Sequence, residues 1–290
     1  MTTRKRSQIN PRMKCPLILF FLMNFLFASS GMSQNQQFPD SGNNLKFNKE
    51  FIISGFTDAR DVLVSPVKWH KSQWLGFTAF AASSVILYTQ DENIRDFLQR
   101  NQTTATGEIS KYGLEPWGSG LYLIPLVGGM YIYGTAGHNP KTETAALLTG
   151  KAMVITGGFT LLFKVVAGRH RPDQDVPADP TLWEGPFNDF KYVSYPSGHT
   201  ALAFSAATVL SSYYHEKTWV AITSYSLATL VGISRIYDDK HWASDVLGGA
   251  VLGFAIGKLV YHNFQKKSNF TFAPYLDGRY QGLSVQYQVK

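Results

Sequence analysis

The sequence predicts an all-α protein: a helical bundle of about six core helices, followed by a short C-terminal β-hairpin. Long uncharged runs recur along the chain, and the Gly, Ala, Ser and Thr residues frequent within them allow close helix packing. Charged residues make up only 16% of the 290 residues, well below the roughly 25% of an average soluble domain. The mean hydropathy of −0.10 is too polar for a chain made only of lipid-facing helices. The composition therefore falls between a soluble helical protein and a small membrane protein.

The first 30 residues have the order of a secretory signal peptide. Five Lys and Arg residues precede an apolar run at 15–28, and small residues follow it. The run is short for a membrane span, although an uncleaved anchor helix is the alternative. Without this segment the formal net charge falls from +7 to +2, so the basic balance gives no support for nucleic-acid binding. Cys15, the only cysteine, would leave with the signal, so the mature chain would have no disulfide and no thiol nucleophile.

Three further segments follow the signal. Residues 31–57 are polar, and we expect a loosely ordered arm. The helical domain is expected over 58–265. In the tail, 266–290, apolar and polar residues alternate on both sides of an Asp-Gly pair, which predicts a β-hairpin. The uncharged runs of the helical domain are 72–90, 116–140, 145–163 (interrupted by Lys151), 200–214, 218–234 and 246–257.

Polar clusters stand at the ends of these runs. The first, KVVAGRHRP at 164–172, closes the run 145–163. The second, SYPSGHT at 194–200, opens the run 200–214. The third, SRIYDDKHWASD at 234–245, closes one run and opens the next. If the helices alternate up and down, all three clusters lie at the same end of the bundle, where side chains from facing helices can build one site.

The cations of these clusters suit a phosphate ligand. Lys164, Arg171 and Arg235 are fixed positive charges; arginine forks match phosphate oxygens, and lysine adds a point charge. Ser197 and Gly198 begin a helix, whose free N–H groups and dipole favour an anion. The glycine also lets the backbone approach the ligand closely. Taken singly, Lys164 and Arg171 are more typical of residues that flank a membrane helix.

The histidines add reactive groups to this cradle. His241 and Asp245 are four residues apart, so on a helix they share one face, and the carboxylate can hold one ring nitrogen while the other acts as nucleophile. His199 remains as a general acid for the leaving oxygen. The set suits phosphoryl transfer without a metal or another cofactor. Arg169 and His170, beside the first cluster, are interpreted as solvated charge, with substrate selection as the alternative.

The three motifs K-x6-RP, PSGH and SR-x5-H-x3-D, in this order, resemble the type 2 phosphatidic acid phosphatase (PAP2) superfamily over roughly residues 75–262. That superfamily includes lipid phosphate phosphatases, bacterial class A acid phosphatases and vanadium haloperoxidases. The matching residues are Lys164, Arg171, Pro172, Pro196, Ser197, Gly198, His199, Ser234, Arg235, His241 and Asp245.

The resemblance implies a helical bundle and a phosphohistidine intermediate on His241. It also implies that Asp245 orients His241 and that His199 protonates the leaving group. The residues that would hold the phosphoryl oxygens are Lys164, Arg171, Ser197, Gly198 and Arg235.

We therefore expect a phosphoric monoester hydrolase of the cell envelope. It would be a metal-independent phosphatase that acts on a phosphate or pyrophosphate ester of a lipid. The alternatives are a soluble periplasmic acid phosphatase that acts on a small phosphate ester, a vanadium-dependent haloperoxidase, and a non-catalytic phospholipid-binding envelope protein. Neither the substrate nor the oligomeric state can be read from the sequence.

The runs of 12 to 25 residues are weak membrane spans, so the membrane and soluble interpretations both remain. We expect a membrane-associated protein with a periplasm-facing site. If the run 72–90 spans the membrane, however, three crossings precede Lys164, and the site of an exported chain lies in the cytoplasm. If that run does not span, two crossings precede Lys164 and the site lies outside.

Overall fold

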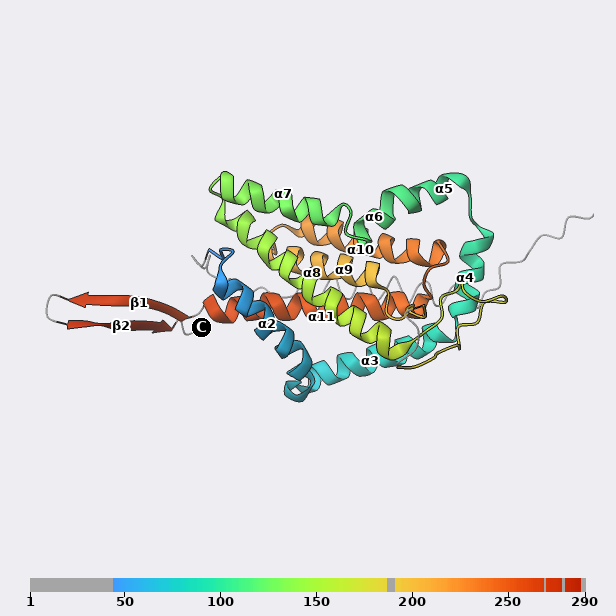
Figure 1. Ribbon diagram of the computed structural model, residues 1–290, viewed down its shortest axis with the longest axis horizontal. Coiled ribbons are helices and arrows are strands. Elements are labelled where there is room, and N and C mark those ends of the chain that lie inside the picture. Colours follow the sequence, from blue (N-terminus) through green and yellow to red (C-terminus); the bar gives the residue numbers. More distant parts are fainter. Residues whose placement is uncertain (1–43, 187–190, 269, 278–279, 288–290) are drawn as a thin grey trace, which may run out of the picture.

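The computed structural model describes residues 44–186, 191–268, 270–277 and 280–287. It is an all-α bundle, in which the helices α8, α9, α10 and α11 lie along one another and shorter helices close one end (Figure 1). The fold class expected from the sequence is confirmed. The expected signal peptide, 1–30, and residues 31–43 of the expected arm lie outside the described residues.

Each uncharged run forms a helix. The helices are α3 (Lys71–Tyr88), α7 (Leu123–Ala136), α8 (Pro140–Ala167), α9 (Gly198–Tyr213), α10 (Thr218–Tyr237) and α11 (Ala243–Ser268). Local signals set the bounds of α8. Asn139 caps its start by accepting a hydrogen bond from the backbone N–H of Thr142 at 3.0 Å, and Pro140 occupies the first helical position. Gly168 ends the helix in the left-handed conformation, with φ of 61°.

Helices α9 and α11 pack closely because glycines recur every fourth residue of α11, at Gly249, Gly253 and Gly257. A Cβ on Gly253 would lie 2.1 Å from the carbonyl oxygen of Ala201, and one on Gly249 would lie 2.3 Å from that of Ser197. A side chain at either position would therefore push the helices apart. This small-residue spacing, typical of membrane helix pairs, holds the start of α11 against the start of α9.

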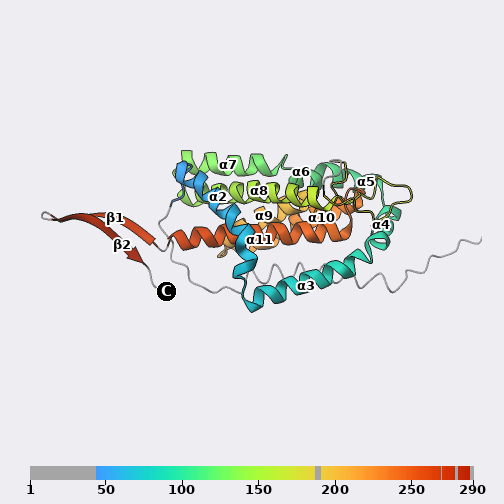
Figure 2. The ribbon, with the colours of Figure 1, turned by 60° about the horizontal axis from the view of Figure 1, so that its bottom comes forward.

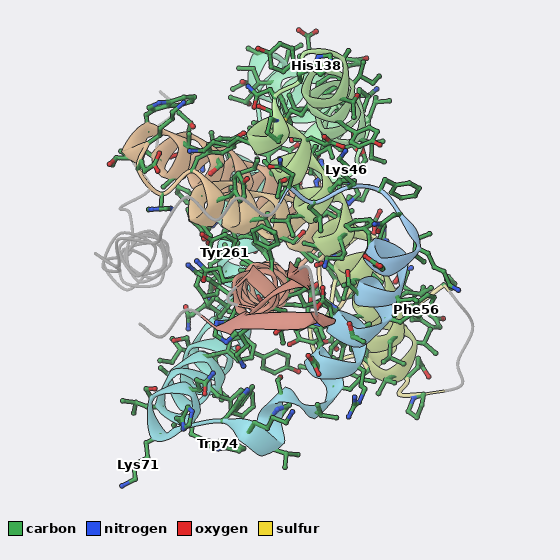
Figure 3. The ribbon with its side chains drawn as sticks, turned by 90° about the vertical axis from the view of Figure 1, so that its left-hand side faces the viewer. Lys46, Phe56, Lys71, Trp74, His138 and Tyr261 are labelled. Atoms are coloured by element: carbon green, nitrogen blue, oxygen red, sulfur yellow. The ribbon has the colours of Figure 1, made fainter. Side chains whose placement is uncertain are left out.

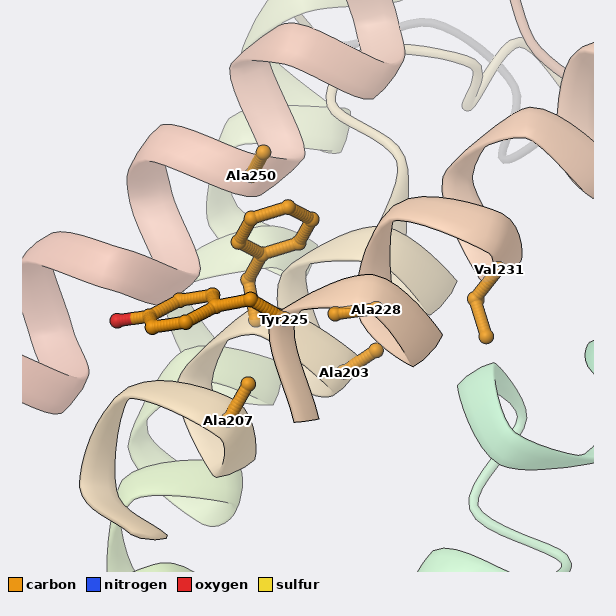
Figure 4. Close-up of a cluster of buried hydrophobic side chains, with 7 residues drawn as sticks. Ala203, Ala207, Tyr225, Ala228, Val231 and Ala250 are labelled. Carbon is orange, nitrogen blue, oxygen red and sulfur yellow. The ribbon is translucent and has the colours of Figure 1, made fainter. Parts of the chain in front are cut away.

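A cluster of small and aromatic residues fills the space between α9, α10 and α11 (Figure 4). The rings of Phe204 and Tyr225 lie 6.0 Å apart in a tilted arrangement, surrounded by alanines. The hydroxyl of Tyr225 donates to Oγ1 of Thr208 at 3.1 Å, so its polar group is satisfied inside the core.

Shorter elements complete the bundle. They are α2 (Lys49–Val64), η2 (Ser65–Lys68), α4 (Asp91–Arg100), α5 (Thr104–Glu108), the π-helical turn η3 (Ile109–Leu114) and α6 (Glu115–Gly118). The elements from α4 to α6 cover the end of the bundle where α8 finishes and α9 begins (Figure 1). The chain ends in the antiparallel strands β1 (Phe270–Asp277) and β2 (Tyr280–Tyr287), with Asp277 opposite Tyr280.

The last nine residues of the expected arm, 49–57, are helical. α2 begins at Lys49 because the side chain of Asn48 accepts a hydrogen bond from the backbone N–H of Phe51 at 2.8 Å. Nζ of Lys151, the residue that interrupts the run 145–163, lies 2.5 Å from Oδ2 of Asp58 on α2. Both side chains are buried. The sequence missed this part of α2 because the helix is held by a partner far along the chain.

Apolar side chains cover much of the outside of the molecule. Phe56 on α2 and Trp74 on α3 are 75% and 49% exposed, and both lie on the outer sides of their helices (Figure 3). Figure 2 shows α3 set apart from the four long helices along much of its length. An apolar exterior of this kind is typical of a surface that contacts lipid or a partner rather than water.

Candidate active site

The three polar clusters meet at one end of the bundle, where α8 and α10 end and α9 and α11 begin (Figure 1). The backbone N–H of Ser197 donates to the carbonyl oxygen of Asp245 at 3.0 Å, which joins the second cluster to the third. A Cβ on Gly198 would lie 3.7 Å from Cε of Lys164, which joins the second cluster to the first.

His241 lies in the turn before α11, and Asp245 lies in the first turn of that helix. The two residues therefore do not share a helical face as the sequence analysis expected. The turn nevertheless brings Nδ1 of His241 to 3.7 Å from Oδ2 of Asp245, with both side chains buried. Because Nδ1 faces the carboxylate, Nε2 is the nitrogen left to act on a ligand.

Burial lowers the pKa of His241 to about 3; Lys164 and Arg171 act in the same direction and Asp245 opposes them. The imidazole is therefore neutral at physiological pH and carries a free lone pair. A neutral nitrogen is the form that a nucleophile requires.

Both oxygens of Asp245 are fixed. Oδ1 accepts a hydrogen bond from Nη1 of Arg169 at 2.6 Å. Oδ2 accepts from Oγ of Ser194 at 2.6 Å and from the backbone N–H of Trp242 at 2.9 Å. Ser194 also lies 3.4 Å from Nδ1 of His241. Ser194 is the first residue of the second cluster, but its contact with Asp245 was not predicted from the sequence.

The interpretation of Arg169 as solvated charge is wrong. Its side chain is fully buried, and Nη2 donates to Oδ2 of Asp91 at 2.8 Å. The guanidinium carbon lies 4.8 to 5.6 Å from the ring centroids of Tyr88, Trp183 and Trp242. Arg169 is buried because the loop after α8 folds back, with Arg169 and Trp183 forming an isolated β-bridge.

His170 is not solvated charge either. Its ring stacks on that of Tyr192, with centroids 3.8 Å apart. Nδ1 lies 2.8 Å from Oδ2 of Asp175, and Nε2 lies 3.0 Å from Oε1 of Glu184. With both nitrogens engaged within the same loop, His170 stabilises the loop that covers Arg169.

The three cations of the motifs have different partners. Nζ of Lys164 donates to the carbonyl oxygen of Val193, and Nη2 of Arg235 donates to Oδ2 of Asp238. Nε of Arg171 is buried and has no hydrogen-bond partner among the described residues. A buried donor without an acceptor is costly, so this nitrogen indicates where an anion binds.

The start of α9 offers further donors. Ser197 is the N-cap residue, but its side chain makes no capping hydrogen bond. Instead, its Oγ accepts a hydrogen bond from Oγ1 of Thr200 at 2.9 Å. An uncapped helix start beside Lys164 and Arg171 can bind an anion through its first N–H groups.

His199 contacts Glu115, which was not predicted as a site residue from the sequence. Its Nε2 lies 3.0 Å from Oε1 of Glu115, the first residue of α6. Burial lowers the pKa of His199, Arg235 acts in the same direction, and Glu115 opposes them. One signal was available in the sequence. Glu115 directly precedes the uncharged run 116–140, at the end of the bundle where the clusters gather.

The aspartates of the third cluster hold the site to the elements around it. Asp238 accepts a hydrogen bond from Arg235 through Oδ2, and its Oδ1 accepts one from Oγ of Ser110 on η3 at 2.8 Å. Asp239 accepts two hydrogen bonds from Arg95 on α4, at 2.6 and 2.7 Å. The turn between α10 and His241 is therefore fixed from two sides.

Comparisons with known proteins show the family of the chain. Residues 145–269 match the PAP2 superfamily. Phosphatidylglycerophosphatase B of Bacillus subtilis is 31% identical, over 51% of this chain and 70% of that protein. The chain belongs to the PAP2 superfamily.

Lipid A 1-phosphatase of Porphyromonas gingivalis is 31% identical to this PAP2 chain, over 62% of the chain. The alignment spans only 36% of that longer protein. Among solved structures, a transmembrane PAP2-type phosphatidylglycerolphosphate phosphatase from Bacillus subtilis aligns with a TM-score of 0.45 and 26% identity, covering 66% of this chain and 96% of that one.

All the site residues expected from the sequence lie inside the PAP2 match, whereas Asp91 and Glu115 precede it. Among the described residues, three helical segments are long and apolar enough to cross a membrane: Pro140–Ala167, Thr218–Tyr237 and Ala243–Lys266. The helix α7 is apolar but shorter. This PAP2 protein is therefore membrane-associated.

Proposed function

We propose that the protein is a metal-independent phosphatase that hydrolyses a phosphate or pyrophosphate ester of a lipid in the cell envelope. The observation that carries the proposal is the neutral, buried His241, fixed through Nδ1 beside Asp245, in a site that gathers three cations and an uncapped helix start. The cations supply the positive charge that phosphoryl transfer requires. Relatives named as lipid A 1-phosphatase and phosphatidylglycerophosphatase B support a lipid substrate.

In the first step, Nε2 of His241 attacks phosphorus. A P–N bond forms and the P–O bond to the leaving group breaks, while protonated His199 gives its proton to the leaving oxygen. Lys164, Arg171 and Arg235, with the first N–H groups of α9, hold the phosphoryl oxygens. Asp245 stabilises the positive charge that develops on His241.

In the second step, a water molecule hydrolyses the phosphohistidine. Neutral His199 takes a proton from the water as its oxygen bonds to phosphorus. The P–N bond breaks and its electron pair returns to Nε2 of His241, so inorganic phosphate leaves and both histidines regain their starting states.

The position of the site favours a lipid phosphate. It lies at the end of three helices apolar enough to span a bilayer, where the headgroup of a lipid would lie. Apolar side chains cover the outer sides of the surrounding helices. A water-soluble ester would not need such a surface near its site.

We also propose that the chain is exported and that the site faces the periplasm. α3 is not among the segments that are apolar enough to span a membrane. We take α8 and the shorter apolar helix α7 as the two crossings that precede Lys164, which leaves the site on the side of the exported N-terminus. At the opposite end, Lys141 lies in the first turn of α8 and Lys217 directly precedes α10, as is common for basic residues that flank membrane helices.

Single cysteines test this orientation. In a Cys15→Ser background, Val176→Cys marks the site end and Glu216→Cys marks the opposite end, both at exposed positions. A membrane-impermeant maleimide should label the first in intact cells and the second only after permeabilisation. The reverse pattern would show that the site faces the cytoplasm.

The activity is tested by phosphate release in detergent with EDTA present. A lipid phosphate and an aryl phosphate are compared, with His241→Ala as the blank and the exposed His215→Ala as the matched control. We expect His241→Ala to lose at least about 1000-fold in rate, as expected when a covalent nucleophile is removed, and His215→Ala to retain activity. Equal activity in His241→Ala would overturn the mechanism. The absence of release by the wild type would favour vanadate-dependent oxidation or lipid binding without turnover.

A further inference from the structure

A chain of three buried charged groups runs behind His241. Asp245 contacts Nη1 of Arg169 at 2.6 Å, and Asp91 contacts Nη2 of the same guanidinium at 2.8 Å. All three side chains have no exposed surface. The aromatic rings around Arg169 separate the chain from solvent, so the charges interact far more strongly than they would in water.

Asp91 also holds the backbone that carries Asp245. Its Oδ1 accepts a hydrogen bond from the backbone N–H of Ser244 at 2.9 Å, and Oγ of Ser244 donates to its Oδ2. Ser244 lies in the first turn of α11, directly before Asp245. The carboxylate of Asp91 therefore completes the start of α11, so both the side chain and the backbone of Asp245 depend on it.

The charges explain why two carboxylates share one guanidinium. If Arg169 faced Asp245 alone, its positive charge would neutralise that carboxylate, leaving little negative charge for His241. Because Asp91 binds the other guanidinium nitrogen, the positive charge of Arg169 is shared between the two carboxylates. Asp245 then retains the negative charge that stabilises a phosphorylated, positively charged His241.

We propose that Asp91 is a positioning residue for the nucleophile, acting on His241 through Arg169 and Asp245. The inference rests on the proposed phosphatase function and extends the site beyond the segment that matches the PAP2 superfamily. It gives α4 a role in the reaction, because the first residue of that helix supplies the carboxylate.

The protonation of Asp91 gives this role a pH signature. Burial raises the pKa of Asp91 to about 6; Arg169, from the loop after α8, opposes the rise, and Asp245, from α11, adds to it. Below that pH, Asp91 becomes neutral and Arg169 acts on Asp245 alone. The rate should therefore fall as the pH drops through about 6.

The test compares Asp91→Asn with Asp96→Asn, which makes the same change at a half-exposed position on the same helix. We expect kcat of Asp91→Asn to fall about 10- to 100-fold, with KM changed less than about threefold, because the nucleophile is displaced while the phosphate cradle is intact. The fall in rate near pH 6 should appear in the wild type and in Asp96→Asn, and be absent from Asp91→Asn. Asp91→Glu, which keeps the charge, should recover part of kcat.

Equal kcat values for Asp91→Asn and Asp96→Asn would overturn the inference. The inference would also be overturned if Asp91→Asn lost activity only in proportion to its loss of thermal stability and kept the pH profile of the wild type. An inactive wild type would instead contradict the proposed function. In that event, the tautomer of His241 tests the positioning role without an activity measurement. The tautomer is read from ¹⁵N-histidine NMR spectra, in which the His241 signals are assigned by their loss in His241→Ala. A tautomer ratio unchanged by Asp91→Asn would reject the positioning role, and a changed ratio would support it.

Discussion

Glu115 Oε1 lies 3.0 Å from Nε2 of His199, so a short helix outside the family match contacts the residue proposed as the general acid. The two side chains are 32% and 30% exposed, which places the contact at the mouth of the site rather than in the core. Glu115 raises the pKa of His199 against the effects of burial and of Arg235. The pair therefore sets how much of His199 is protonated at a given pH.

Glu115→Gln should shift the pH dependence of the reaction. Without the carboxylate, the pKa of His199 falls further, so the protonated form disappears at a lower pH. The basic limb of the kcat profile should therefore move to lower pH, and the rate at neutral pH should fall. Glu108→Gln, an exposed position on α5, is the matched control. Superimposable profiles for the wild type and Glu115→Gln would show that Glu115 does not act on the general acid.

Arg171→Ala should weaken the binding of inorganic phosphate, the product. The buried Nε of Arg171 has no partner among the described residues, and a hydrogen bond to a charged group contributes about 1.5–3 kcal/mol. We expect the inhibition constant for phosphate to rise about 10- to 100-fold. Arg171→Lys should recover little, because an ammonium cannot reproduce the planar fork. Lys111→Ala removes an exposed cation on η3 and should leave the inhibition constant unchanged. If Lys111→Ala raised the constant as much as Arg171→Ala, Arg171 would act only through the net positive charge of the protein.

Gly253→Ala should destabilise the bundle by forcing α9 and α11 apart. A Cβ at this position would lie 2.1 Å from the carbonyl oxygen of Ala201. Because this oxygen belongs to the backbone, no side-chain rotation can relieve the clash. Overpacking of this kind costs about 1–3 kcal/mol, which thermal unfolding in detergent can measure. Gly158→Ala on α8 is the control, since a Cβ there meets no atom within 4 Å. If both variants unfold at the same temperature, the close approach of α9 and α11 is not required.

Asp58→Ala should loosen the attachment of α2. The substitution removes the carboxylate that Lys151 contacts inside the bundle, and breaking a buried ion pair costs about 3–5 kcal/mol. The double variant Asp58→Ala/Lys151→Met should recover most of the stability, because an apolar side chain then fills the place of the charge. Thermal unfolding and proteolysis between α2 and α3 measure both effects. A double variant as unstable as the single one would contradict an ion-pair origin.

Much of the site could be predicted from local sequence. Uncharged runs marked six of the helices, because burial and membrane insertion both act on apolar side chains over successive turns. Motif spacing placed Lys164, His199 and His241 at the ends of those runs, so the alternation of the helices was enough to bring them to one end.

The tertiary structure decided how the charges around those residues are paired. Asp91 and Arg169 are 78 residues apart, and Glu115 and His199 are 84 apart. Nothing near Arg169 in the sequence distinguishes a solvated arginine from one enclosed by Tyr88, Trp183 and Trp242. A buried charge is stable only beside the partner that compensates it, and that partner is chosen by the packing of distant segments. The sequence by itself therefore determined the helices and the reactive side chains, whereas only the folded chain decided which carboxylates hold them in place.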